Sequence, residues 1–375
     1  MKNPIRIEPS IWEGDTRMPA SWRVLAGLLR GDSLGQADLR NRTGLSHPVI
    51  VQQVAQLRRA GLITFGAPIS GQPGRPRVPM TFNWNFRRLL AVEVHSSGIT
   101  VQATDLRGEL QGSISTGTIA EWSTEGIKKA IVKAVRTAIR SNGSPFAAIG
   151  VVIPGIISAD HQVAISCLDV ADWADVNLGE ELTAEFNIPV LLENDANALA
   201  LALASNPDED TDSILAISMR QQVQVGLGMI FNGRVIRGIH AGSFGNTPIE
   251  NGTLETMLRA SRNDEGKRND ALVALFDKIA DLVTAINPKN LVMQGDDRWS
   301  EDDLTILRAT LEARCYAPAF ADLTLEYRQN APIESLTGIT SLLSDYVLNL
   351  ENGLITSWSV IEQPAAATKR TPIIR

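Results

Sequence analysis

The sequence predicts an α/β protein with a small basic head and a larger acidic body of two similar lobes. Two short helical patterns and two short β-like runs lie within residues 33–82. From residue 89 onward, strand-like runs and amphipathic helices alternate in two successive rounds. Residues 1–88 carry 13 Lys/Arg and 5 Asp/Glu, a net +8, so the other 22 Lys/Arg and 37 Asp/Glu give the rest a net −15.

Length and composition agree with this division. The 375 residues suffice for two or three domains, and 44% hydrophobic with 21% charged residues is ordinary for a globular protein. No apolar run approaches the roughly 18–20 residues that span a bilayer, and the N-terminus lacks an apolar signal core, so we expect a cytoplasmic protein without membrane contact. The two cysteines, Cys167 and Cys315, indicate neither a disulfide framework nor a zinc cluster.

The head begins with a helix predicted over residues 20–30 and a shorter one over 36–42. Gly44 ends the shorter helix, because glycine readily takes the left-handed conformation of a helix stop. Ser46 can cap the next helix, and Pro48 lies in its first turn, where a missing N–H costs nothing. Two helices joined by such a turn are typical of a helix-turn-helix.

In the third helix, Ile50, Val54 and Leu57 recur at i, i+4 and i+7 and form the inward stripe. The helix can therefore present its other face to the major groove, with its N-terminal side chains against base edges. A glutamine there can pair with adenine, and valines can meet thymine methyl groups. The candidate DNA-contacting residues of this helix are Ser46, His47, Val49, Val51 and Gln52.

Residues 62–65 and 78–82 read as two short strands around a Gly/Pro loop that carries Arg75 and Arg77. This is the pattern of a wing, whose arginines can contact phosphates or a narrow minor groove. Each piece alone also fits an ordinary helical domain or surface loop. Their order, their spacing and the basic charge together favour a winged helix-turn-helix that binds palindromic double-stranded DNA as a homodimer or tetramer.

The body is predicted as two rounds of strands followed by helices. In the first round, strands are expected over 89–94, 99–105, 110–115, 147–153 and 190–193, and helices over 125–141, 178–186 and 196–204. In the second round, strands are expected over 214–219, 223–231, 235–237, 291–294 and 323–327, and helices over 270–286, 303–313 and 338–350. We thus expect a winged helix-turn-helix domain over 1–86, a two-lobed domain over 87–350 and a C-terminal tail over 351–375.

A family resemblance is carried by Glu193-Asn194-Asp195-Ala196-Asn197-Ala198, which resembles the Glu-Asn-Asp-Ala-Asn-Ala signature of the ROK family of repressors, open reading frames and sugar kinases. Further family segments are resembled in the same order by residues 150–155, by 168–173, by the hairpin segment of 226–228, 232–234 and 237–238, and by 251–255. The resemblance covers roughly residues 20–350. It implies an actin-like, hexokinase-like body, and the winged head is the layout of the repressor branch.

Departures from the family pattern argue against catalysis. Kinases of the family open with Asp-x-Gly-Gly-Thr, whose glycines let the backbone approach ATP phosphates. Residues 92–98 read Val-Glu-Val-His-Ser-Ser-Gly instead, and Gln294-Gly295-Asp296-Asp297 adds negative charge where phosphates would lie. We therefore predict no catalytic residues and no phosphoryl transfer, with a sugar kinase kept as the less favoured alternative.

The sugar site is altered as well. Ser243 and Asn246 stand where the family has the glutamate and histidine of Gly-Glu-Ile-Gly-His, and the family's cysteine segment is missing, so no zinc and no cofactor are expected. Asn194, Asp195 and Glu255 remain of the implied sugar site. The ligand-binding candidates are thus Asn194, Asp195, Ser243, Asn246 and Glu255, and the expected partner is a sugar-like effector.

Plainer roles remain open for these residues. Asp195 can cap the helix that starts at Ala196, Glu255 can be a surface residue, and Trp173 can pack in the core rather than stack on a sugar. Without a nucleotide, Asp195 would only hydrogen-bond a ligand. We interpret the chain as a DNA-binding repressor with a sugar-derived effector; the alternative is a ligand-independent DNA-binding protein whose body only dimerises.

Overall fold

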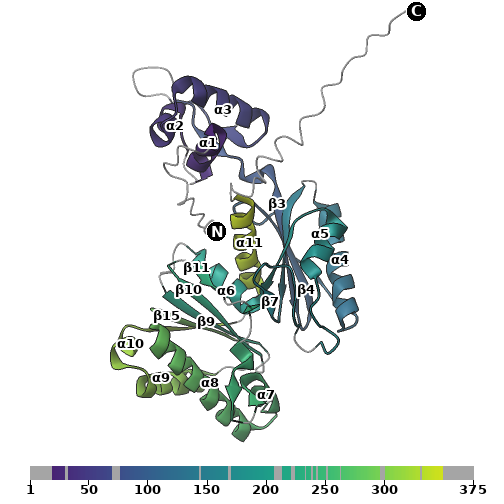
Figure 1. Ribbon diagram of the computed structural model, residues 1–375, viewed down its shortest axis with the longest axis vertical. Coiled ribbons are helices and arrows are strands. Elements are labelled where there is room, and N and C mark those ends of the chain that lie inside the picture. Colours follow the sequence, from purple (N-terminus) through teal and green to yellow (C-terminus); the bar gives the residue numbers. More distant parts are fainter. Residues whose placement is uncertain are drawn as a thin grey trace, which may run out of the picture. The chain divides into compact units, whose positions relative to one another are not determined.

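The computed structural model (Figure 1) describes residues 19–29, 33–69, 77–142, 145–167, 170–206, 213–220, 224–232, 234–237, 240–241, 244–250, 252–261, 263–295, 300–329 and 332–348. The described residues form two compact units. Among the described residues, the body comprises those of Arg88–Thr104 and Gly108–Leu343, and the head comprises those between 19 and 87, the turn Asp105–Arg107 and Ser344–Leu348.

The head contains three helices and a two-stranded hairpin, as the sequence predicts. Its elements are α1 (Ala20–Leu29), α2 (Gln36–Thr43), α3 (His47–Arg59), β1 (Ile63–Phe65), β2 (Met80–Phe82) and the 3₁₀ helix η1 (Trp84–Phe86). β1 and β2 pair antiparallel with Ile63 opposite Phe82. Gly44 has φ = 67°, the left-handed conformation expected of the residue that ends α2.

A closed apolar core holds the head together. Ile50 of α3 is fully buried, and Val54 and Leu57 are each 4% exposed, which places the predicted stripe inward. Leu34 exchanges two backbone hydrogen bonds with Met80, at 3.0 and 2.8 Å, and so ties the loop before α2 to the hairpin. The core therefore fixes α3 so that its opposite face meets solvent.

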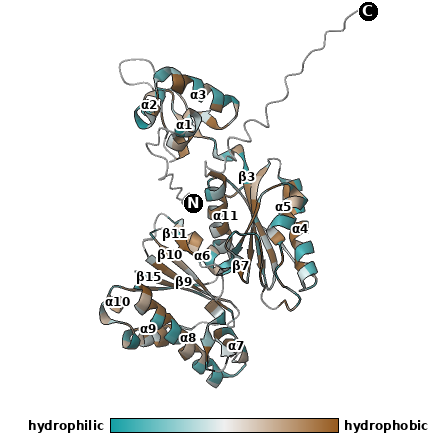
Figure 2. Cartoon of the chain, viewed as in Figure 1, coloured by the Kyte–Doolittle hydropathy of each residue, from teal (hydrophilic) through white to brown (hydrophobic). Residues whose placement is uncertain are grey.

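The first lobe of the body is a five-stranded sheet in the order β5-β4-β3-β6-β8. Its strands are β3 (Arg88–His95), β4 (Gly98–Asp105), β5 (Ser115–Gly117), β6 (Phe146–Ile153) and β8 (Val190–Asn194), with the short β7 (Ile157–Ser158) beyond β6. Helices α4 (Thr124–Ser141) and α5 (Leu178–Phe186) lie beside this sheet (Figure 1). The strands are mostly apolar, and the helices carry hydrophilic stretches outside the core (Figure 2).

The second lobe repeats the plan in the order β11-β10-β9-β15-β16. Its strands are β9 (Ser213–Arg220), β10 (Gln224–Phe231), β11 (Arg234–Ile236), β15 (Asn290–Gly295) and β16 (Thr324–Gln329), and its helices are α7 (Leu254–Ala260), α8 (Glu265–Ile286), α9 (Glu301–Arg314) and α10 (Ala317–Ala321). In each sheet the third, second, first, fourth and fifth strands along the chain follow one another in space. The two predicted rounds are thus two lobes of one topology.

Helix α6 (Asp195–Ala204) contacts β6 and β8 of the first sheet and β9 and β10 of the second. Its alanines permit this close packing. A Cβ on Gly228 would lie 2.5 Å from the Ala196 carbonyl oxygen, and one on Gly338 would lie 1.7 Å from the Ala198 carbonyl oxygen. Gly338 belongs to α11 (Pro332–Leu348), so α6 is held between β10 and α11 with no room for a methyl group.

Smaller elements complete the body. They are β12 (His240–Ala241), η2 (Phe244–Asn246), β13 (Pro248–Ile249) and β14 (Gly252–Thr253). β12 pairs antiparallel with β7, which joins the second lobe to the first by backbone hydrogen bonds. No helix within the described ranges is long and apolar enough to cross a membrane.

Candidate DNA-binding face and ligand cavity

The solvent face of α3 carries the predicted DNA-contacting side chains. Ser46, His47 and Gln52 are exposed, Val51 is 41% exposed, and Val49 is half-buried. Ser46 is the N-cap residue of α3 by backbone position, but the structure shows no capping hydrogen bond from its side chain. The Ser46 hydroxyl is therefore not committed to capping the helix.

The wing places its one described arginine against α2. Arg77 forms an ion pair with Asp38 at 2.7 Å and donates to the Ser33 carbonyl at 3.0 Å, while the Asp38 carboxylate also accepts the Gly35 amide at 2.7 Å. These bonds fix the base of the wing to the start of α2. Arg77 is half exposed and can reach a phosphate only beside Asp38. Arg75 lies outside the described residues.

In the body, Asn194 caps α6. Its side-chain oxygen accepts the amides of Ala196 (2.9 Å) and Asn197 (3.2 Å), and its amide nitrogen donates to the Gly155 carbonyl (2.8 Å) and to Asp195 Oδ1 (2.9 Å). Asn194 is thus the N-cap residue of α6, and Asp195, the capping residue considered from the sequence, also accepts the Ala196 amide through Oδ1 at 3.0 Å. All three side chains of this turn, at 194, 195 and 197, are less than 10% exposed. They are fixed by the protein before any ligand arrives.

A small cavity of about 20 Å³ lies at this turn, between the two lobes of the body. The first lobe contributes Pro154, Gly155, Asn194 and Asp195, and the second contributes Gln224, Val225, Gly226 and Glu255. Three of the five predicted ligand residues, Asn194, Asp195 and Glu255, are therefore brought together. The volume is about that needed for a single water molecule, so a sugar requires the lobes to separate.

Glu193, one residue earlier, links the lobes. It is 1% exposed, and its Oε2 accepts two bonds from Arg237, at 3.1 Å from Nε and 2.6 Å from Nη2. Oε1 accepts the Asn194 amide and Asn197 Nδ2 at 2.9 and 3.1 Å. Arg237 follows β11, the edge strand of the second sheet, and β8 is the edge strand of the first. The ion pair thus joins the two sheets directly beside the cavity.

The hairpin between β3 and β4 contains the segment that the sequence resemblance sets against the Asp-x-Gly-Gly-Thr of the family's kinases. His95 Nδ1 lies 2.8 Å from Ser97 Oγ, and His95 Nε2 lies 2.9 Å from Thr100 Oγ1. Gly98 adopts φ = 140°, and a Cβ there would lie 2.1 Å from the Gly117 carbonyl oxygen. The turn is therefore closed by its own side chains and by β5.

Of three other residues considered from the sequence, two lie outside the cavity lining and one lies outside the described residues. Asn246 is exposed on η2, outside the set that lines the cavity, and Ser243 lies outside the described residues. Trp173 is 6% exposed and donates from Nε1 to the Ala164 carbonyl at 2.8 Å, so it packs in the core of the first lobe.

Sequence reasoning missed Gln224 and Arg237 as members of the site. Both lie in the β10–β11 region, and the pair Arg237–Glu193 is 44 residues apart in the chain. Arg237 stands in a hairpin segment that resembles the family, which marks it as notable. Its partner could not be inferred, because the pairing depends on how the lobes meet.

The fold and the site define a class of protein: a helix-turn-helix head on a two-lobed body of actin-like architecture. Residues 89–270 match the model of the ROK family, and the chain carries a ROK-family domain, as the sequence motifs predict.

Relatives fall on both branches of that family. The chain is 25% identical over 232 residues to the xylose repressor of Bacillus spizizenii, a match that covers 60% of this chain and 59% of that protein. A solved structure described as a ROK family transcriptional regulator, homolog of the E. coli MLC protein, aligns with TM-score 0.69 and 18% identity over 91% of this chain and 98% of its own. The ROK hexokinase of Thermus thermophilus aligns with TM-score 0.54 and 19% identity over 69% of this chain and 98% of its own.

Proposed function

We propose that this protein is a cytoplasmic, sequence-specific DNA-binding transcriptional repressor whose operator affinity depends on a sugar-like ligand bound between the lobes of its body. The observation that carries the proposal is the exposed N-terminal half of α3, held by the core of a winged basic head. The similarity to a protein named xylose repressor supports it. Because that match spans about three fifths of the relative, repression and the effector are inferences for this chain.

The proposed DNA contact follows from the geometry of α3. Thirteen residues make a helix about 20 Å long, and its width suits a major groove about 12 Å wide. Gln52 and Val51 lie on the exposed face for base contact, and Arg58 and Arg59 are exposed near its end for phosphates. A two-fold homodimer would present two such helices and read a palindrome with half-sites about 34–36 Å apart, or a multiple of that.

The proposed effector site uses the groups already fixed at α6. Asn194, Asp195 and Glu255 offer carboxylate and amide groups that suit vicinal hydroxyls. A ligand that enters must separate β8 from β11 and disturb the Arg237–Glu193 pair. It would thereby favour a different arrangement of the lobes, and such differential binding is what shifts an equilibrium between states.

Loss of kinase activity is part of the proposal. The His95–Ser97–Thr100 bonds fill the turn that would have to cradle phosphates, and no paired glycines are present there. Asp195 would then act as a hydrogen-bond acceptor and not as a base. An ADP-release assay over a panel of hexoses should show no turnover; turnover abolished by Asp195→Asn would restore the kinase alternative.

The DNA part is tested by selecting fragments of the source genome with the purified full-length protein at physiological salt. We expect an enriched palindrome, bound more weakly by about 1–3 kcal/mol when Gln52→Ala removes one base contact. Asn85→Ala, an exposed change elsewhere in the head, serves as the matched control and should leave the affinity unchanged. Retention that is equal for all fragments would contradict sequence-specific binding.

A second candidate is a ligand-independent DNA-binding protein, and the 20 Å³ cavity favours it specifically. Thermal unfolding against a library of sugars and polyols separates the two candidates. A ligand present at about 100 times its Kd should stabilise the protein by about 2.7 kcal/mol, and the effect should vanish in Asp195→Ala. No stabilisation by any compound at millimolar concentration would favour the second candidate.

A further inference from the structure

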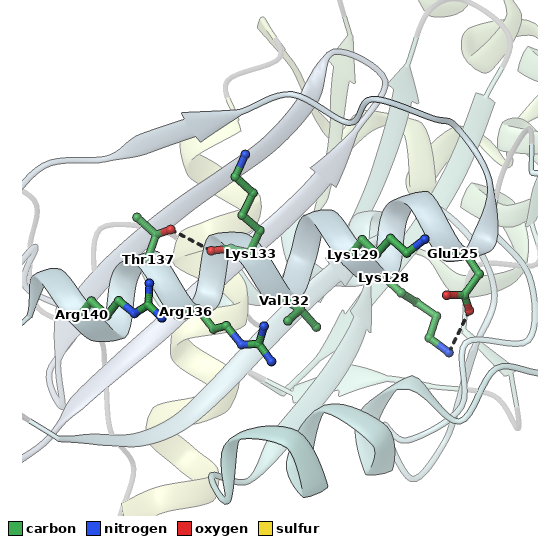
Figure 3. Close-up of a pocket in the computed structure, with 8 residues that line it drawn as sticks. All are labelled: Glu125, Lys128, Lys129, Val132, Lys133, Arg136, Thr137 and Arg140. Atoms are coloured by element: carbon green, nitrogen blue, oxygen red, sulfur yellow. Dashed lines mark hydrogen bonds and ion pairs between the residues drawn. The ribbon is translucent and has the colours of Figure 1, made fainter.

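Helix α4 presents a basic face to solvent on the first lobe. Its inner residues Ile127, Ile131 and Val135 are fully buried against the sheet. Five of the six charged residues of α4 are cationic, and they line an open surface hollow of about 580 Å³ (Figure 3). The hollow is lined by Glu125, Lys128, Lys129, Val132, Lys133, Arg136, Thr137 and Arg140.

The charge is segregated within this lobe. Between residues 108 and 219 the sequence has five Lys/Arg, all of them in α4, against sixteen Asp/Glu. A solvated helix on an acidic body would ordinarily mix both signs along its surface, with carboxylates spaced to pair with the cations. Here a single helix holds every cation of the segment, so the hollow is a local region of positive potential in a part of the chain, residues 89–375, whose net charge is −15.

The cations of α4 divide between its two edges. Lys128 forms an ion pair with Glu181 of α5 at 2.5 Å, and Arg136 pairs with Glu185, one turn further along α5. The bond to Glu181 raises the pKa of Lys128. Figure 3 shows Lys128 and Arg136 on one side of the helix and Lys133 on the other. One edge is therefore neutralised by the protein itself.

The other edge keeps its charge. Lys129, Lys133 and Arg140 are exposed, and none of them forms an ion pair with any residue that the structure describes. They lie at i, i+4 and i+11, which places them along one side of the helix over about 16 Å. Val132 is half-buried on the side of Lys128 and Arg136, four residues from each of them, and lines the hollow there (Figure 3).

We propose that this edge of α4 is a docking surface for an acidic segment of another protein. The contact between α5 and α4 shows which groups this helix binds. On α5, two carboxylates four residues apart form ion pairs with two cations of α4. A narrow chain with similarly spaced carboxylates can pair with Lys129, Lys133 and Arg140 along this edge of α4.

The test uses the full-length protein and labelled poly-L-glutamate as the probe. A carbodiimide is added to join lysine amines to probe carboxylates as amides, and mass spectrometry locates the joined lysines. The head has no lysine within the described ranges, and Lys267, Lys278 and Lys289 of the second lobe act as internal controls. We expect crosslinks at Lys129 and Lys133 in excess of those at the three control lysines. Equal labelling of all five would overturn the proposal.

Affinity measurements with variants complete the test. The triple variant Lys129→Gln, Lys133→Gln, Arg140→Gln should weaken probe binding at least tenfold at low salt, where exposed charges are least screened. The matched variant Lys267→Gln, Lys278→Gln, Arg308→Gln removes three cations from the second lobe. It should change the affinity for the probe less than twofold. An equal loss of probe affinity in both variants would contradict binding at this edge of α4. A non-operator duplex is measured in parallel, and weakening of duplex binding as large as that of the probe would show a nucleic-acid surface instead.

Discussion

Replacing Arg237 by methionine tests the link between the lobes. The change leaves Glu193, 1% exposed, as a buried carboxylate without its guanidinium partner. Breaking a buried ion pair in this way costs about 3–5 kcal/mol, and the 22% exposure of Arg237 points to the lower end. For a unit of this size, each kcal/mol corresponds to roughly 2–4 °C in Tm, so we expect a loss of about 9 °C.

The assay is thermal unfolding of four full-length proteins followed by circular dichroism: wild type, Arg237→Met, Glu193→Gln and the double variant. Because the double variant leaves no unpaired charge, it should be more stable than Arg237→Met alone, a non-additive outcome expected of groups in contact. Arg234→Met, an exposed change on β11, is the control. Additive effects, or a loss of under about 2 °C in Arg237→Met, would refute the assigned role of the pair.

Two further predictions concern packing and pH. Gly338→Ala should destabilise the body by about 3 kcal/mol or more, since its Cβ would lie 1.7 Å from the Ala198 carbonyl oxygen, whereas Gly117→Ala, with nothing within 4 Å, should be nearly neutral in urea unfolding. Burial raises the pKa of Asp303, but the bonds and charge of Arg268 together with the hydrogen bonds of Ser300 outweigh it and leave that pKa below its ordinary value. This stabilisation is present above the unfolded pKa of about 3.9 and is lost as pH falls through the folded value. Asp303→Asn should therefore lower stability by about 2 kcal/mol at neutral pH. The difference in urea midpoint should narrow as pH falls below about 4 and close only below the folded pKa, and a constant difference would contradict the assignment.

The elements of the fold could be predicted from the sequence where hydrophobic periodicity and turn residues agree. The stripe of Ile50, Val54 and Leu57, with a glycine that stops α2, predicts the head correctly. The alternation of strands and helices predicts both lobes. Such patterns are local, because each residue's role depends on neighbours within one or two turns of the chain.

Boundaries were missed where local signals conflict with tertiary contacts. A helix was expected to begin at Gly338, but α11 begins at Pro332, and Gly338 lies inside it because α6 passes too close for a side chain. Helix α8 begins at Glu265 and not at 270, because its first turns are polar and show no apolar period, while Asp264 caps it through the Lys267 amide at 3.1 Å.

The third strand of the first lobe was expected over 110–115 and is β5, at Ser115–Gly117. Leu110 forms only an isolated bridge with Thr104. All three residues of β5 are exposed, so it has no hydrophobic alternation that would locate it. The short helix α7, seven residues long, was not predicted for a related reason: its length is too small for a periodic signal.

The candidate ligand site was predicted only in part. The motif at residues 193–198 places Asn194 and Asp195, and Glu255 joins them across the lobes. The assignment of the cap to Asn194, and the partnership of Glu193 with Arg237, depend on side-chain geometry between segments far apart in the chain. Neither the size of the cavity nor its closed state has a sequence signal.

The central claim, that a ligand between the lobes controls DNA binding by the head, is tested most directly by one measurement. The affinity of the full-length protein for its selected operator is determined by fluorescence anisotropy, with and without the sugar that most raises its Tm. We predict a change of about 5- to 150-fold, the usual range of coupling between two sites, and its loss in Asp195→Ala. An operator affinity that stays the same in the presence of a bound sugar would contradict the account.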